Sequence, residues 1–283
     1  MKQGIYSDIP AADYHADPCD TPSLSSSIAK LLLERPPYWA WAAHPQLNPE
    51  WSPQEPKAAF DIGSAAHALL LEDGAGIEMV EADNWLTKAA KERRDSLRAK
   101  GITPILTRDF ERTFQMSQVA AAFLAEYGID ATKTDNECTM IADVDGVLCR
   151  TRADIYMPGR IIDYKTTGLS LDVFDKQASK FGYDLQAAMY RRVALELGEK
   201  CEWLFLVQET VAPYPVQLFK PTLEFMEVGT RKFEQALSIW HECMLLDEWP
   251  GYPKDIQLVD AMPWDLNELN EEHESNLLSG VEQ

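Results

Sequence analysis

The sequence predicts an α/β (α+β) protein in which a central mixed β-sheet is flanked by helices. Apolar residues recur at helical spacing in residues 58–72 and 108–127, and from Thr132 the hydrophobic pattern changes to the period of two that β-strands have. After Thr167 helical spacing returns and encloses residues 203–209, a nearly continuous apolar segment that is typical of a central strand. A chain of 283 residues is long enough to bury a substantial core around such a sheet.

We expect one domain over residues 1–264, with a helical part at about 1–130 and the sheet core at about 131–264. Residues 1–22 are rich in turn-forming residues and are expected to lie across the surface as an arm. Residues 265–283 contain six acidic residues and neither lysine nor arginine, which predicts a mobile acidic tail.

Composition restricts the classes of protein that fit. The five cysteines are scattered and form no C-x-x-C pair, which favours reduced intracellular thiols over disulfides or a zinc site. There is no run of 18 apolar residues and no basic-then-apolar leader, so we expect a cytoplasmic protein without a membrane span. The formal net charge of −20 is opposite to that of a generally basic nucleic-acid-binding surface. Contact with DNA would therefore need a local basic groove or metal ions.

The segment Ser23–Ser27 precedes an apolar run at helical spacing that ends at Pro36-Pro37. Serine in this place predicts a helix N-cap. The same hydroxyl groups and free N–H groups also suit a phosphate, which makes Ser25 and Ser26 candidate DNA contacts. The pattern alone leaves both roles open.

Two further helical segments carry candidate functional residues. Residues 58–72 combine small residues with apolar spacing and predict a tightly packed helix on which His67 is either a core residue or a ligand. Residues 84–100 hold six basic residues against two acidic ones, a reversal of sign in this acidic chain. This basic segment is either a solvated helix face or a track for a phosphate backbone. Its candidate DNA contacts are Lys88, Lys91, Arg93 and Arg94.

The period-two region predicts three antiparallel strands. Residues 137–142 and 147–156 flank an Asp-Gly turn and predict a hairpin, and residues 161–165 predict a third strand. Asp154 interrupts an otherwise strand-like run, which is unfavourable unless something binds it. These strands would bring Glu137, Asp154 and the third strand into one region.

The third strand carries Asp163 and Lys165, which share one face because side chains alternate along a strand. A carboxylate beside an ammonium suits a site in which the acid holds a divalent cation and the lysine orients water or offsets charge. An ordinary ion pair on a solvated strand is the alternative. A helix at about residues 183–197 follows, on which Gln186 and Tyr190 share a face.

The chain ends in strand-like and helical segments that complete this arrangement. Residues 203–209 predict a central strand, and the prolines of residues 213–220 indicate an edge strand beside it. A long helix is expected from about Thr222 to Leu246.

The order helix, three strands, helix and strand, with these residues at these places, resembles the PD-(D/E)xK nuclease superfamily. The upstream pair Gly63-x-x-x-His67 narrows the resemblance to the branch that has this helical motif. Over most of residues 4–255 the chain is similar to the nuclease domain of exonuclease VIII (RecE). The segments that carry this similarity are Tyr14-His15, Ser23–Lys30, Gly63–Glu72, Leu148–Lys165 and Asp247–Pro250.

The resemblance implies a restriction-endonuclease-like core that hydrolyses DNA phosphodiesters with Mg²⁺ or Mn²⁺. By analogy, the metal ligands would be His67, Asp154, Asp163 and the backbone carbonyl of Tyr164. Lys165 would position the attacking water or stabilise charge at phosphorus, and Gln186 and Tyr190 would orient Lys165 or the substrate. Glu137 would hold a water or a second metal, and Arg152 is a further candidate DNA contact.

Members of this branch act as rings on duplex ends and degrade one strand from its 5′ end. The resemblance therefore implies an exodeoxyribonuclease of recombination, of phage or prophage type, that is a homo-oligomer and works with a single-strand annealing protein. An endonuclease or a single-strand exonuclease of the same fold remains open. So does an inactive acidic DNA mimic, which the net charge favours but which has no need of the acid, lysine and histidine set.

Overall fold

The computed structural model describes residues 1–52, 61–72, 74, 76–264 and 266–267. The chain divides into two compact units, Met1–Pro250 and Gly251–Gln283. The domain boundary expected at residue 264 stays a prediction. The predicted acidic tail, residues 265–283, lies outside the described residues except for residues 266 and 267.

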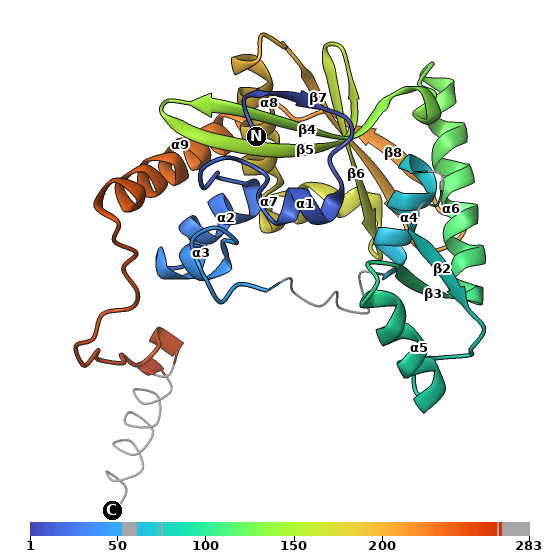
Figure 1. Cartoon of the computed structure of the whole chain (residues 1–283), viewed down its shortest axis with the longest axis horizontal. Coiled ribbons are helices and arrows are strands. Elements are labelled where there is room, and N and C mark those ends of the chain that lie inside the picture. The colour runs from blue at the N-terminus through green and yellow to red at the C-terminus, as the bar shows by residue number, and fades with distance from the viewer. Residues whose placement is uncertain (53–60, 73, 75, 265, 268–283) are drawn as a thin grey trace, which may run out of the picture. The chain divides into compact units, whose positions relative to one another are not determined.

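The first unit is built on a six-stranded sheet with the order β1-β4-β5-β6-β7-β8 (Figure 1). β6 and β7 are parallel, whereas the other neighbouring pairs are antiparallel. The mixed sheet predicted from the sequence is therefore confirmed. Its strands are β1 (Gly4–Tyr6), β4 (Asp135–Val144), β5 (Val147–Met157), β6 (Arg160–Thr167), β7 (Glu202–Glu209) and β8 (Val216–Phe219).

Local chemistry explains the two connections that shape this sheet. The β4–β5 hairpin turns at Asp145 and Gly146, both of which have positive φ, as a tight hairpin turn requires. A parallel neighbour needs a crossover, and α7 (Phe174–Phe181) and α8 (Tyr183–Glu196) supply it between β6 and β7. These two helices meet at Gly182, whose φ of 73° is in the left-handed region.

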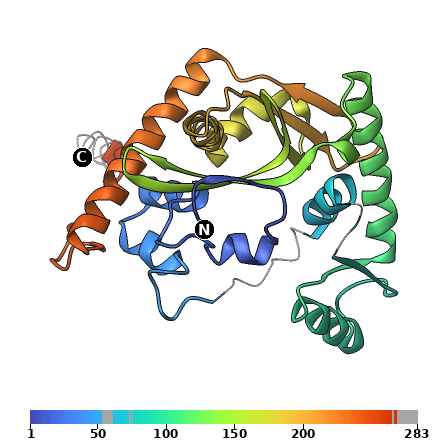
Figure 2. The ribbon, with the colours of Figure 1, turned by 45° about the horizontal axis from the view of Figure 1, so that its top comes forward.

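Two apolar clusters cover the two faces of the sheet. Neighbouring side chains of β6 point to opposite faces of the sheet. Ile161 accordingly belongs to the larger cluster and Ile162 to the smaller. The larger cluster takes residues from α2 (Ser26–Glu34), α7, α8 and α9 (Leu223–Leu246), and the smaller one from α4 (Asp61–Leu71) and α6 (Thr107–Glu126). Figure 2 shows α7 and α8 on one side of the strands and α4 on the other.

A small second sheet stands beside α4 and α6. β2 (Ile77–Val80) and β3 (Thr103–Leu106) pair in parallel, and α5 (Lys88–Arg98) connects them. The sequence predicted only the helix, because four-residue strands are too short to show a clear period of two. No helix in the described part of the chain is both long and apolar enough to span a membrane.

Residues 1–22 lie mostly at the surface, as expected, but they are also attached to the sheet. β1 pairs with β4, and α1 (Ala11–His15) buries Tyr14. The buried Asp17 carboxylate accepts the Ser23 hydroxyl at 2.7 Å and lies 3.0 Å from the Arg150 guanidinium. Turn-rich composition gives no indication of such long-range partners. α3 (Tyr38–Ala43) and the short helical turns Ala131–Lys133 and Leu171–Val173 complete the described elements.

Candidate active site

The sheet is opened where β5 and β6 diverge. Their register pairing is confined to Ile155–Met157 of β5 opposite Arg160–Ile162 of β6, whereas β6 stays paired with β7 as far as Thr167. Beyond Ile162 the backbone N–H of Tyr164 donates a hydrogen bond to Asp154 Oδ2 at 2.7 Å. A side chain thus accepts the bond that a strand carbonyl would accept in a regular ladder.

A second irregularity lies opposite, at Glu137 of β4. Its φ of 52° is in the left-handed region, which is uncommon for a residue with a side chain and recurs at functional sites. Across the ladder, Ala153 belongs to the larger apolar cluster and Ile155 to the smaller, although residues i and i+2 of a regular strand share a face. The alternation is therefore broken at Glu137 and Asp154.

These irregularities bring three candidate ligands together. One ligand atom each from His67, Glu137 and Asp154 lies within 4.8 Å of the other two. His67 Nδ1 is 3.8 Å from Asp154 Oδ2, and the histidine side chain is 27% exposed, so the cluster is open to solvent. α4 approaches β6 closely, since a Cβ atom at Gly63 would lie only 3.2 Å from Thr166 Oγ1.

Asp163 and Lys165 form the adjoining part of the site. The Lys165 Nζ atom is 2.7 Å from Asp163 Oδ2, and the Asp163 side chain is only 2% exposed. Gln186 of α8 donates to Asp163 Oδ1 at 2.8 Å. The ring of Tyr183 lies beneath the ammonium, 4.8 Å from it. The shared face predicted from alternation thus places the carboxylate, the ammonium and the carboxamide in contact.

Burial determines the charges of this cluster. It raises the pKa of Asp154 well above its usual range, and the neighbouring Asp163 carboxylate raises it further. Burial also raises the pKa values of Asp163 and Glu137, although Lys165 and Arg152 respectively oppose the shift. These shifts show that the negative charges are incompletely neutralised.

The pKa values of the two nitrogen bases, His67 and Lys165, are shifted in opposite directions. Burial, with help from Lys165, lowers the pKa of His67 to about 4, so the imidazole is neutral near pH 7 and can act as a ligand. Burial alone would lower the pKa of Lys165, but the Asp163 and Asp154 carboxylates outweigh it and raise that pKa. The two carboxylates therefore favour the charged, ammonium form of Lys165.

The residues fit a divalent cation. Asp163 Oδ2 is buried, and the Lys165 ammonium 2.7 Å away is its counter-ion. The fit to a cation rests on the donor set, because His67, Glu137 and Asp154 each offer one ligand atom within 4.8 Å of the others. Carboxylate oxygens suit Mg²⁺, and the neutral imidazole also suits Mn²⁺.

The remaining predicted residues lie around this centre in different ways. Tyr190 of α8 is buried, which raises the pKa of its hydroxyl, and the nearby Ser26 side chain opposes that rise. Ser25 caps α2 by accepting from the backbone N–H of Ile28. Arg152 donates to Glu137 Oε2 at 2.6 Å and to the Ile9 carbonyl. Its role as a DNA contact stays a prediction, since here its guanidinium is engaged within the protein.

The basic segment lies on α5, which packs against β2 and β3 rather than the six-stranded sheet (Figure 1). Three of its four candidate side chains have acidic partners on the surface. The pairs are Lys88 with Glu92, Arg93 with Glu78 and Arg94 with Asp95, whereas Lys91 is exposed. Their contact with a phosphate backbone also stays a prediction.

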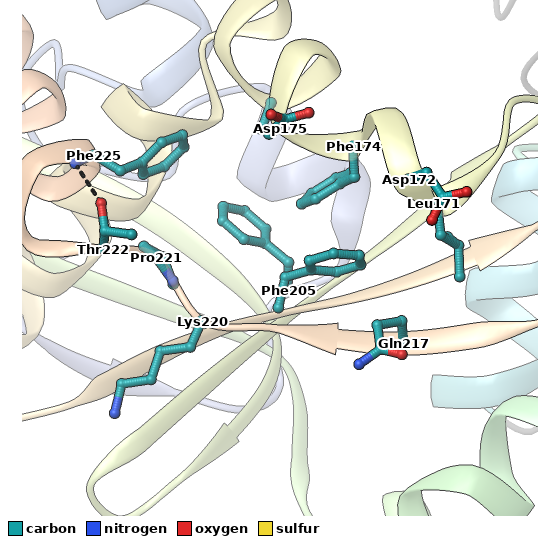
Figure 3. A pocket seen from close by; sticks show the side chains of 12 residues that line it. Leu171, Asp172, Phe174, Asp175, Phe205, Gln217, Lys220, Pro221, Thr222 and Phe225 are labelled. Carbon is teal, nitrogen blue, oxygen red and sulfur yellow. Dashed lines mark hydrogen bonds between the residues drawn. The ribbon is translucent and has the colours of Figure 1, made fainter.

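An apolar cavity of about 530 Å³ lies apart from this polar cluster. It opens at the β8 edge between the start of α7 and the start of α9, and Figure 3 shows the rings of Phe174, Phe205 and Phe225 at its wall. None of the candidate ligands lines it. The candidate ligands therefore lie together at the divergence of β5 and β6 and not in this cavity.

Two residues beside the site were not predicted from the sequence. Tyr183 lies under the Lys165 ammonium, and Gln208 accepts the hydroxyl of Tyr164. A signal existed for Gln208, because a carboxamide inside a nearly continuous apolar strand has to find hydrogen-bond partners in the core. No signal in the sequence connected Tyr183 with Lys165.

Comparison with known proteins agrees with this fold. A protein from Eubacterium rectale, whose crystal structure is described as that of a "Putative exonuclease", has the same fold at 14% sequence identity and a TM-score of 0.60. The match covers 92% of this chain and 98% of that chain. No curated protein matches the sequence significantly. Residues 25–262 match the family described as a PDDEXK-like domain of unknown function (DUF3799), and the chain therefore belongs to this PDDEXK-like family.

Proposed function

We propose that this protein is a metal-dependent exodeoxyribonuclease that hydrolyses phosphodiesters from the ends of linear duplex DNA, in the 5′-to-3′ direction, during recombination. One observation carries the hydrolytic part of the proposal. His67, Glu137 and Asp154 converge beside the Asp163–Lys165 pair at the divergence of two strands. The preference for duplex ends, the polarity, an oligomeric ring and an annealing partner are supported by the resemblance to exonuclease VIII.

The chemistry follows from what each side chain can do. A bound Mg²⁺ or Mn²⁺ would supply Lewis-acid stabilisation of a phosphoryl oxygen and would favour ionisation of water. His67, Glu137, Asp154 and Asp163 are the residues that would hold it. The Lys165 ammonium, 2.7 Å from Asp163 Oδ2, would position the attacking water or stabilise charge developing on phosphate oxygens. Gln186 fixes the Asp163 carboxylate by donating to its other oxygen.

End-labelled linear duplex DNA tests the proposal directly. The intact chain is expected to release a 5′ label before a 3′ label with Mg²⁺ or Mn²⁺ and to be inactive in EDTA. A closed circular duplex should remain intact. Cutting of the circle would favour an endonuclease, and preferential loss of single strands would favour a single-strand exonuclease. No cleavage with either metal would favour the acidic DNA mimic, which the net charge of −20 suits.

Lys165→Met is expected to lower turnover about 100-fold while Mn²⁺ affinity stays the same or increases. The substitution removes an ammonium that would stabilise the transition state, and it frees the Asp163 carboxylate from an ion pair. Single-turnover cleavage and Mn²⁺ titration measure the two quantities separately. Equal losses of turnover and of Mn²⁺ affinity would contradict the role assigned to Lys165.

Mn²⁺ is expected to raise the melting temperature more at pH 8 than at pH 5. The pKa of Asp154 is raised above its usual 3.8, so the stability it contributes is present below 3.8 and is lost as pH rises through the raised value. A cation opposes that loss because it neutralises the ionised carboxylates. At a free Mn²⁺ concentration of about 100 times Kd the gain is about 2.7 kcal/mol, which corresponds to roughly 5–10 °C.

Asp154→Asn is the control for this pH dependence. The amide carries no charge at either pH, so the variant should melt higher than the unsubstituted chain without metal at pH 8 and should show little response to Mn²⁺. Thermal unfolding followed by circular dichroism at both pH values makes the comparison. A Mn²⁺ shift that is equal at pH 5 and pH 8 would be inconsistent with carboxylates of raised pKa at the cation site.

A further inference from the structure

Gln208 of β7 is a buried polar residue that the proposed chemistry does not use. It has no exposed surface although it lies in an otherwise apolar strand. Its Nε2 donates to the carbonyl of Met116 on α6 at 2.9 Å and to the carbonyl of Tyr214 at 3.2 Å. Its Oε1 accepts the hydroxyl of Tyr164. Both ends of the carboxamide are therefore fixed, and its orientation is determined by two backbone carbonyls.

Tyr164 connects this carboxamide with the candidate active site. Its side chain is also fully buried, and its ring centroid lies 4.8 Å from that of His67. The backbone N–H of the same residue donates to Asp154 Oδ2 at 2.7 Å. Tyr164 thus contacts both a candidate imidazole ligand and a candidate carboxylate ligand, while Gln208 accepts a hydrogen bond from its hydroxyl.

We propose that Gln208 is a positioning residue that acts through Tyr164 to orient His67 and Asp154 for a divalent cation. This inference rests on the metal dependence of the proposed function. A buried hydrogen bond that fixes a side chain against a metal ligand sets the direction of that ligand, and loss of such a partner typically weakens metal binding about 10–100-fold. The Tyr164 side chain is fully buried and its hydroxyl is bonded to Gln208, so its effect would be exerted through the ligands.

The alternative is that the carboxamide only stabilises the packing of β6, β7 and α6. A structural role would lower the melting temperature without changing the affinity of the folded chain for a cation. A positioning role changes the affinity itself and is overcome by excess cation, because every candidate ligand is still present. Mn²⁺ affinity therefore separates the two roles.

Mn²⁺ titration of the intact chain, followed by electron paramagnetic resonance, tests the inference with Tyr164→Phe and Gln208→Leu. Tyr164→Phe removes one oxygen atom and keeps the ring, so it preserves packing even where Gln208→Leu does not fold. We expect each single variant to bind Mn²⁺ about 10-fold more weakly. The double variant should bind no more weakly than Gln208→Leu, since that substitution already removes the Tyr164–Gln208 hydrogen bond. At saturating Mn²⁺, DNA cleavage by Tyr164→Phe should recover to within about 3-fold.

Thr113→Val on α6 is the matched control. Thr113 is equally buried, but its hydroxyl donates to the carbonyls of Asp109 and Phe110 within its own helix. It should lower stability without altering Mn²⁺ affinity. Unchanged Mn²⁺ affinity in Tyr164→Phe would overturn the inference, as would an equal loss in Thr113→Val. Weakened Mn²⁺ binding in a chain that cleaves no DNA would refute the nuclease proposal and still support the positioning role.

Discussion

Asp163→Asn is expected to reduce metal-dependent DNA cleavage by about 1,000-fold or more. The amide has nearly the same volume as the carboxylate but no negative charge, so it cannot hold a divalent cation with comparable strength. The substitution also leaves the Lys165 ammonium without its nearest counter-ion. The folded state should persist, because the charge of Asp163 is unfavourably buried and its removal does not empty the site.

The measurement is the initial rate of label release from linear duplex DNA, with circular dichroism to confirm folding. Asp172→Asn is a suitable control, because this exposed acid lies outside the cluster. It should cleave at the rate of the unsubstituted chain. If Asp163→Asn retained more than about a tenth of the activity, the assignment of the cation site to the divergence of β5 and β6 would be wrong.

Gly229→Ala is expected to be among the most destabilising single substitutions in the chain. A Cβ atom at Gly229 would lie 2.0 Å from the backbone carbonyl oxygen of Asp184, so α9 and α8 must separate by about 1 Å or more to admit it. Overpacking against backbone costs about 3 kcal/mol or more, since no side chain can rotate away. In a domain of this size that cost lowers the melting temperature by roughly 6–12 °C.

The effect should extend to the active site because the first turns of α8 carry Gln186, which donates to Asp163. Gly168→Ala provides the comparison. Its Cβ would meet nothing closer than Thr210 Oγ1 at 3.9 Å, and its melting temperature should change little. Thermal unfolding of both variants decides the matter. A Gly229→Ala protein with an unchanged melting temperature would show that α8 and α9 do not cross at this distance.

The sequence predicted those features that depend on local pattern. The period of two, the Asp-Gly turn and the apolar segment of β7 predicted the strands, and the spacing of Asp163 and Lys165 predicted their shared face. The site departs from the regular strand pattern at Glu137 and Asp154, where side chains no longer alternate between the two faces of the sheet. No count of apolar and polar residues could indicate that Ala153 and Ile155 lie in different clusters.

Contacts between segments distant in the chain were also beyond prediction. Asp17 looked like one polar residue in a turn-rich stretch, yet it is held by Ser23 and lies against Arg150. Arg152 looked like a cation available to DNA and instead pairs with Glu137. In both cases the tertiary structure brings together residues that are distant in the sequence. The charge of a residue in the sequence therefore does not indicate whether that residue is available to a ligand.

The divergence of β5 from β6 also has a consequence for motion. The β4–β5 hairpin carries Glu137 and Asp154, whereas β6, continuously paired with β7, carries Asp163 and Lys165. Only the short ladder ending at Ile155 and Ile162 joins these two halves through strand pairing. Small rotations about that ladder would change the separation of the acids while each half keeps its own hydrogen bonds. Within β6, the Tyr164 amide bonded to the Asp154 side chain should therefore exchange faster than the amides in the ladder with β5, and its protection would report how firmly the two halves are held together.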